Sequence, residues 1–332
     1  MRRWLLVLAI TACSHAAEPP PSTTVAQPAA TAAATAGGSE VDPWDPPAVA
    51  PPADAPPSLA DTVALADAAC PTVPHPYLFA VTTKSGKTSF LLGTRHLGVG
   101  LAKLPPVVRD SFVHSTLAVF ETDPKDTSTA PPTAHADPLH VQLGDVAWAH
   151  FRELAGRSLA DRLDDEPVST ALIQLVAMYE DKSHALDLEL ENLAADTKIP
   201  TAGLESSAFQ DALIEKLMDA RALRAILVVA HTRADLQADS HDDLASYCAG
   251  ERTELDPKEH DDMVRGGYSE VEIADYEDAI LYARNRSWIP ELEKIVGAGN
   301  AFIAVGADHL MGPRGVPALL SARGYTVTRV TP

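Results

Sequence analysis

The chain has 332 residues, of which 46% are apolar, so it can bury one large hydrophobic core or two smaller ones. Its formal net charge of −20 argues against nucleic acids and anionic membrane surfaces as partners, because an acidic surface repels phosphate groups. We therefore expect no nucleic-acid partner.

The N-terminus has the pattern of an export signal. Two arginines precede an apolar run from Trp4 to Ile10, and small residues stand directly before Cys13. The run is too short to cross a bilayer as a mature helix. It resembles the lipobox of bacterial lipoproteins, so we expect residues 1–13 to be a lipoprotein signal and Cys13 to carry the lipid. Ser14, where Asp would signal inner-membrane retention, favours the outer membrane; an ordinary signal peptide is the alternative.

Residues 14–60 are rich in Pro and Ala and contain almost no large apolar side chain. Such a segment cannot bury enough surface to offset the loss of chain entropy on folding. We expect a disordered tether that holds the folded part away from a membrane to which the lipid is anchored.

The folded part is expected over residues 70–330. The sequence predicts two strands joined by a short turn, then alternating helices and strands. The predicted strands are 77–81, 89–92, 117–120, 199–204, 300–305 and 325–330. The predicted helices are 104–115, 206–237, 240–248, 269–283, 286–296 and 316–322, with further helices over 144–198 that break near Gly156 and Pro167. This pattern predicts an α/β fold, with a central mixed β-sheet, flanking helices and a large helical insertion at about 144–296.

Two cysteines remain in the folded part. In an exported protein, Cys70 and Cys248 are candidates for one disulfide between the first segment and the helical insertion. Two unpaired buried thiols are the alternative, and the spacing does not decide between them.

Four predicted strands lead into side chains that can bind metals or move protons. These are His96, Glu121, Glu205 and His309. The carboxyl ends of strands line the ligand-binding crevice of open α/β sheets. Gly93 and Gly306 each precede a histidine by three residues, and we expect them to supply a sharp turn through positive φ and close backbone approach. Residue types alone leave two readings: a shared metal or acid–base site, and histidines with only structural roles.

Five motifs occur in order along the folded part: LLGTRH, VFETD, GLESSAFQ, RNRSW and AFIAVGADHLMGPRGVPALLSARGYTV. Together they resemble the TraB/GumN family, whose animal relatives include the Wnt-inactivating Tiki proteins. The resemblance covers about residues 72–330 and implies a metal-dependent hydrolase, with peptide cleavage the activity associated with Tiki-type members.

The resemblance implies roles for individual residues. It makes His96, Glu121 and His309 ligands of one divalent metal ion (Mn, Co, Zn or Fe) and Glu205 the general base, with the two glutamates exchangeable. Arg284 and Asn285 occupy the Arg-Asn pair of the family. Arg284 is a candidate for stabilising oxyanion charge, and an ion pair within the helical insertion is its alternative role.

Two residues depart from the family pattern. Arg95 stands where an aliphatic residue is usual, and Asp308 stands where a glycine is usual. Both add polar groups beside the expected site.

The expected function is that of a membrane-tethered, divalent-metal-dependent hydrolase of the bacterial cell envelope, peptidase-like, acting on a peptide or another small envelope substrate. The alternative is a noncatalytic envelope lipoprotein that binds a peptide or other ligand in the same crevice. We expect the helical insertion to cover the crevice and to supply no metal ligand.

Overall fold

The structure is a computed structural model that describes residues 56–130, 137–255 and 257–331. The expected lipoprotein signal, Cys13 and most of the expected tether lie outside the described residues. The first described helix, α1 (Leu59–Ala69), begins within the last residues assigned to the tether. The Ser58 hydroxyl accepts a hydrogen bond from the Asp61 N–H, and the Asp61 carboxylate accepts one from the Ser58 N–H. This capping box starts a helix that the Pro-rich composition concealed.

Six strands form one mixed sheet in the order β4-β3-β5-β2-β1-β6. Their bounds are β1 (Leu78–Thr82), β2 (Thr88–Thr94), β3 (Leu117–Thr122), β4 (Thr201–Glu205), β5 (Ala301–Gly306) and β6 (Thr326–Arg329). The strands β4, β3, β5 and β2 are parallel neighbours, whereas β1 pairs antiparallel with β2 and β6. The expected α/β fold with a mixed sheet is confirmed.

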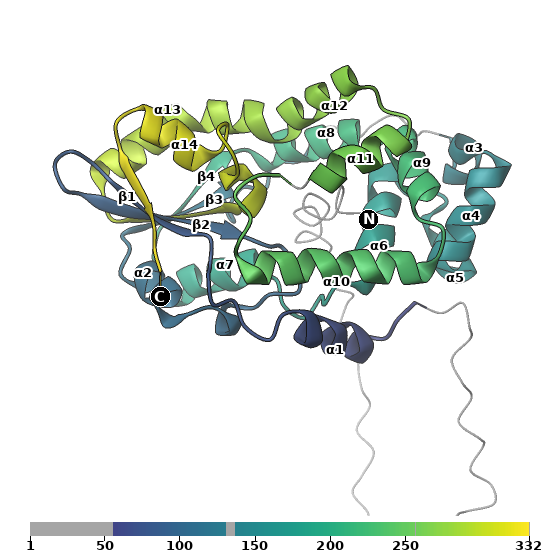
Figure 1. The fold of residues 1–332 in the computed structure, drawn as a ribbon, viewed down its shortest axis with the longest axis horizontal. Coiled ribbons are helices and arrows are strands. Elements are labelled where there is room, and N and C mark those ends of the chain that lie inside the picture. The colour runs from purple at the N-terminus through teal and green to yellow at the C-terminus, as the bar shows by residue number, and fades with distance from the viewer. Residues whose placement is uncertain (1–55, 131–136, 256, 332) are drawn as a thin grey trace, which may run out of the picture.

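The strand β5 lies in the interior of the sheet between β3 and β2. All six residues of its AFIAVG sequence are buried, as is typical of a parallel strand covered on both faces. Figure 1 shows α13 (Ala283–Ala298) and α14 (Val316–Ala322) on one side of the sheet, and α2 (Pro106–Val113) and α7 (Leu186–Thr197) on the other. Phe112 of α2 packs edge-on against Phe302 of β5, with ring centroids 5.0 Å apart.

A second hydrophobic cluster lies in the helical part of the molecule, which is to the right of the sheet in Figure 1. Its helices are α3 (Leu139–Leu143), α4 (Asp145–Ala155), α5 (Arg157–Leu163), α6 (Val168–Val176), α8 (Ser207–Leu217), α9 (Ala220–Val229), α10 (Arg233–Ala249), α11 (Pro257–Arg265) and α12 (Glu270–Glu277). Breaks occur at Gly156, between α4 and α5, and at Pro167, just before α6.

The single helix expected over 206–237 is wrong: the segment forms α8, α9 and the start of α10. Asp219 and Thr232 interrupt it because each accepts a hydrogen bond from a backbone N–H three residues later and so starts a new helix. The helix α11 was not predicted. A π-helical segment (Asp278–Tyr282) joins α12 directly to α13.

The helix α10 is attached to the rest of the chain by a disulfide. The structure bonds Cys248 of α10 to Cys70, which follows α1, with their Cα atoms 5.7 Å apart. Within residues 56–130, 137–255 and 257–331, no helix combines the length and apolar character needed to cross a bilayer.

Candidate functional site

The carboxyl ends of the four parallel strands bring the predicted site residues to one edge of the sheet. In the register, Thr94 of β2 is opposite Gly306 of β5, and Thr122 of β3 is opposite Glu205 of β4. Glu121 and Glu205 belong to β3 and β4 themselves, whereas the two histidines follow their strands. His96 comes two residues after β2, and His309 lies in a 3-10 turn (Ala307–Leu310) directly after β5.

The two glycines allow close contact, but the expected positive φ is wrong. Neither Gly93 nor Gly306 has positive φ, and Gly306 has φ −51°. A Cβ at Gly306 would lie 3.2 Å from Glu121 Oε1, 3.6 Å from His309 Cδ2 and 3.9 Å from His96 Nε2. A Cβ at Gly93 would lie 3.0 Å from the Ala307 Cα. The sheet therefore gathers the three predicted metal ligands around Gly306, where a side chain would fill the space between them.

Arg284, on α13, joins the two carboxylates. Its Nη2 donates to Glu121 Oε2 and to Glu205 Oε1, both at 2.6 Å, and its Nε lies 3.1 Å from both Glu205 oxygens. The remaining nitrogen, Nη1, lies 3.0 Å from the Ile280 carbonyl and 3.1 Å from His309 Nε2. The side chain is 1% exposed. The ion pair with Glu205 lies within residues 144–296, as the alternative role expects, whereas the ion pair with Glu121 extends outside that range to β3.

The two glutamates differ in electrostatic setting. Burial alone would raise the pKa of Glu121, but Arg284, His309, His96 and the Gly306 N–H lower it far below its usual range. Burial raises the pKa of Glu205, although hydrogen bonds from Arg284 and the Trp288 indole oppose the rise. Glu121 is therefore held as a carboxylate, while Glu205 is the one with the greater tendency to take up a proton.

His309 is held by Asn285. The Asn285 Oδ1 lies 2.6 Å from His309 Nδ1, and the Asn285 Nδ2 donates to the carbonyls of His309 and Arg314 at 3.2 and 3.0 Å. An amide oxygen can only accept, so Nδ1 carries the proton and Nε2 keeps its lone pair. Burial, opposed by Glu121 and reinforced by Arg284, lowers the pKa of His309 to about 3. His309 is therefore a neutral imidazole.

His96 is held by a carboxylate. Its Nδ1 lies 2.7 Å from Asp187 Oδ2 on α7, and the other Asp187 oxygen accepts from Thr94 Oγ1 at 2.6 Å. Burial works against the charged imidazole, but Asp187 and Glu121 raise the pKa of His96 above its ordinary value. The Nε2 of His96 lies on the side of Gly306, 3.9 Å from the position that a Cβ of residue 306 would take.

The donor chemistry of this site suits a divalent metal. Two imidazoles with Nδ1 occupied and Nε2 toward a shared carboxylate form the arrangement in which second partners orient ligating histidines. Arg284, however, lies against two of the three predicted ligands. In the part of the chain that the structure describes, no three His, Cys, Asp or Glu side chains are grouped closely enough to hold a metal ion.

Three contributors to the site were not predicted. Gln210 of α8 donates to Glu121 Oε2 at 3.0 Å, and the Trp288 ring of α13 contacts His309 at a tilt of 44°, with ring centroids 4.5 Å apart. Both lie inside the motifs GLESSAFQ and RNRSW, so attention to every polar residue of those motifs could have found them. Asp187 gave no signal, since it is one of several acidic residues on α7.

The sequence matches the TraB/PrgY/gumN family over residues 78–329. The match covers the sheet, the helical part and every predicted residue of this site. The chain belongs to the TraB/PrgY/gumN family. No curated protein and no solved structure matches it.

Proposed function

We propose that the chain is a divalent-metal-dependent hydrolase, peptidase-like, which acts on a peptide or another small substrate of the bacterial cell envelope. The observation that carries this proposal is the paired setting of the two imidazoles. Each has Nδ1 bonded to an oxygen acceptor; the Nε2 of His96 lies near Gly306, and the Nε2 of His309 lies 3.6 Å from Glu121 Oε1. Hydrogen bonds that fix Nδ1 and leave Nε2 available favour histidines that bind a metal ion over histidines with a purely structural role.

His96, Glu121 and His309 would hold the ion. A divalent metal bound there would polarise a substrate carbonyl and lower the pKa of a bound water. Binding requires Arg284 to move away from Glu121 and His309, because its guanidinium contacts both.

Glu205 is the proposed proton acceptor. Its burial raises its pKa, which brings it closer to the value at which a carboxylate can accept a proton and then release it. Trp288 and Arg284 orient its carboxylate. Arg284 would keep its Nε contact with Glu205 after leaving Glu121 and would stabilise negative charge that develops on the substrate.

The second candidate is a noncatalytic protein that binds a peptide or other ligand in the same crevice. It is favoured by Arg284, which satisfies both carboxylates and lies where the predicted ligands converge. In this alternative, a ligand carboxylate would compete for the guanidinium and no turnover would follow.

Metal analysis of the full-length chain tests the two candidates. We expect His96→Ala and His309→Ala each to remove nearly all bound metal and peptide cleavage, and the double variant to be little worse, because ligands of one ion act as a unit. Glu205→Gln should keep the metal and lose turnover. His260→Ala, which removes an exposed histidine paired with Glu270, is the matched control.

Metal content is measured by mass spectrometry, and cleavage is measured on a peptide library with Mn, Co and Zn. Full metal content in the double histidine variant would eliminate the proposed ligand set. Metal-free wild-type protein that binds peptides without cleaving them would establish the second candidate.

We also propose that an acyl chain on Cys13 tethers the protein to the envelope membrane, most simply the outer membrane. The proposal rests on the lipobox-like residues before Cys13. Cells labelled with a fatty-acid analogue should label the wild type and not Cys13→Ser. Equal labelling of both would refute the anchor.

A further inference from the structure

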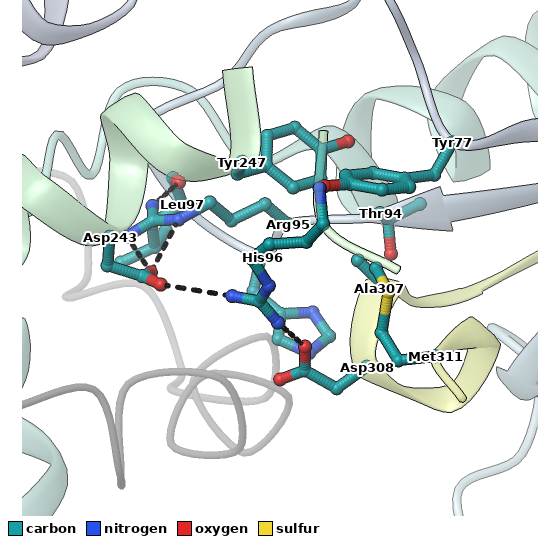
Figure 2. Close-up of a pocket in the computed structure, with 11 residues that line it drawn as sticks. Tyr77, Thr94, Arg95, His96, Leu97, Asp243, Tyr247, Ala307, Asp308 and Met311 are labelled. Carbon is teal, nitrogen blue, oxygen red and sulfur yellow. Dashed lines mark hydrogen bonds and ion pairs between the residues drawn. The ribbon is translucent and has the colours of Figure 1, made fainter. Parts of the chain in front are cut away.

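Arg95 and Asp308 lie in one chain of ion pairs. They directly precede the two site histidines, and both line the cavity of Figure 2. We call the following set the ion-pair chain: Glu180, Arg95, Asp243, Arg252 and Asp308. Its members alternate in sign, and each contacts the next.

Arg95 connects the His96 turn to the helical part. Its guanidinium donates to Asp243 Oδ2 at 3.0 and 3.1 Å and to the two Glu180 oxygens at 2.8 and 3.0 Å. Asp243 lies on α10, and Glu180 follows a 3-10 turn (Ala177–Tyr179). Arg95 is therefore fixed from two helical elements at once.

Arg252 connects the same helix to the His309 turn. One end of its guanidinium donates to Asp308 Oδ1, and the other lies 3.8 Å from the second oxygen of Asp243. The backbone supports this link, since the Arg252 N–H donates to Tyr77 Oη at 3.1 Å and the Gly312 N–H donates to the Thr253 carbonyl at 2.8 Å. Asp243 thus binds one arginine with each oxygen, and the two histidine turns are joined through it.

The two turns touch at Gly93 but leave a small cavity beside the contact. Gly93 lies against Ala307 and Leu310, whereas His96, Asp308 and Met311 line a cavity of about 20 Å³. A space of this size accommodates at most a water molecule or two. Direct packing therefore leaves a gap between His96 and Asp308, and the ion pairs join the two turns across this side.

Buried ion pairs are costly to desolvate and are weak evidence for a gain in stability. Glu180, Asp243 and Asp308 are all buried, and Arg95 is 8% exposed. We expect the ion-pair chain to fix the relative positions of its members rather than to add stability, because each carboxylate and guanidinium accepts only a narrow range of partner positions.

We propose that Arg252 is a positioning residue that, through Asp243 and Asp308, fixes the spacing between His96 and His309. The inference rests on the proposed function, in which the two imidazoles act on one centre. The inference adds that the helical part sets the distance between His96 and His309, through Asp243 on α10 and Arg252 just after this helix.

The test uses the full-length chain and four variants. Arg252→Met removes the bridging charge, and Arg252→Lys keeps it with less directional bonding. Asp308→Asn removes the charge of Asp308 while keeping its shape, so it also serves if Arg252→Met does not fold. Arg152→Met, which breaks the pair with Asp161 at the end of α4, is the matched control.

The deciding readout is the set of side-chain ¹⁵N–¹H NMR signals of His96 and His309 at constant pH, assigned with variants of each histidine. Arg252→Met and Asp308→Asn should broaden or split both histidine signals. Arg252→Lys, which keeps a positive charge between Asp243 and Asp308, should keep single signals, and Arg152→Met should change neither. With a cleaved substrate in hand, kcat of Arg252→Met should fall about 10- to 100-fold, with KM within about twofold, as expected of a misplacement on the order of 1 Å.

Single, unshifted signals of both histidines in Arg252→Met or Asp308→Asn would overturn the proposal, even if the unfolding temperature fell. Perturbation of His309 alone would also overturn it, because the spacing argument requires both turns to respond. If the wild type shows no metal and no turnover, the proposed function fails, but the histidine signals still decide the positioning role.

Discussion

His96 and His309 occupy equivalent places in the sheet and have opposite electrostatics. Each follows a glycine by three residues, and each bonds its Nδ1 to an oxygen. The partner of His309 is a neutral amide, and the pKa of His309 is lowered to about 3, mainly by burial. The partner of His96 is a carboxylate, which contributes to raising the pKa of His96. The repeated motif therefore fixes where a ring lies, while residues from distant helices decide its charge.

The supports of the two histidines also come from different parts of the molecule. His309 is held by α13, which packs on the sheet, through Asn285 and Arg284. His96 is held by α7 through Asp187, and its turn is held by α10, whose Tyr247 hydroxyl donates to the Gly93 carbonyl at 2.9 Å. Changes in α13 should therefore act first on His309, and changes in α7 should act first on His96.

The largest effect is expected from Arg284→Met. This variant leaves Glu121 and Glu205 buried without their cation, and loss of one partner from a buried ion pair costs about 3–5 kcal/mol. Arg286→Met, two residues along the same helix, breaks an exposed pair with Asp278 and should cost about 0–1 kcal/mol. Urea unfolding of both variants measures the difference. Equal stabilities would show that Arg284 does not hold the carboxylates together.

A reciprocal exchange of partners tests the comparison itself. Asn285→Asp gives His309 a carboxylate and should raise its pKa, while Asp187→Asn gives His96 an amide and should lower its pKa. NMR titration of the metal-free protein measures both. If neither pKa moves, burial and Arg284 set the charges of the rings and the partner does not.

The same exchange changes stability. Asn285→Asp should cost about 2–3 kcal/mol, because the two carbonyls that Asn285 Nδ2 binds lose their donor. In the wild type, His309 binds a proton only when unfolded between about pH 6.5 and 3, so its contribution to stability falls as pH falls through that window. A raised His309 pKa moves the lower end of this window upward, so the acid loss of stability should still begin near pH 6.5 but should end at a higher pH and be smaller in total.

The sheet and the four strand-end side chains were predictable, and most of their supports were not. The apolar runs that end at Thr94, Thr122 and Gly306 carry local signals, and the rules for parallel sheets place their ends together. Asp187 lies 91 residues from His96 along the chain, so only the packing of α7 brings them into contact. The boundaries of α8, α9 and α10 depended on single capping residues inside one long apolar pattern, where periodicity gives no break.

The glycines show a different limit. The spacing of Gly93 and Gly306 before the histidines predicted their importance, but the reason was close approach and not positive φ. A sequence shows that a side chain is absent at a position, whereas only the neighbouring chains show which atoms fill its place.

The smallest effect is expected at Glu191, which lies one helical turn after Asp187 on α7. Burial raises the pKa of Glu191 to about 7, and the charges of Asp187 and Asp123 add to the rise. Because the native state then binds a proton that the unfolded state has released, stability falls as pH rises from about 4.5 to about 7. Glu191→Gln removes this loss, so the variant should be more stable than the wild type at pH 8.

The gain at pH 8 should be about 1 kcal/mol, less than the full pKa shift implies, because the side chain is partly exposed to solvent. At pH 4, where both forms are neutral, the two proteins should unfold at the same urea concentration. Glu291→Gln, at an exposed position of α13 paired with Lys294, is the control and should show no such pH dependence. If Glu191→Gln and the wild type are equally stable at both pH values, the Glu191 carboxylate does not destabilise α7 next to Asp187. The contrast between the two histidines would then rest on Asp187 alone.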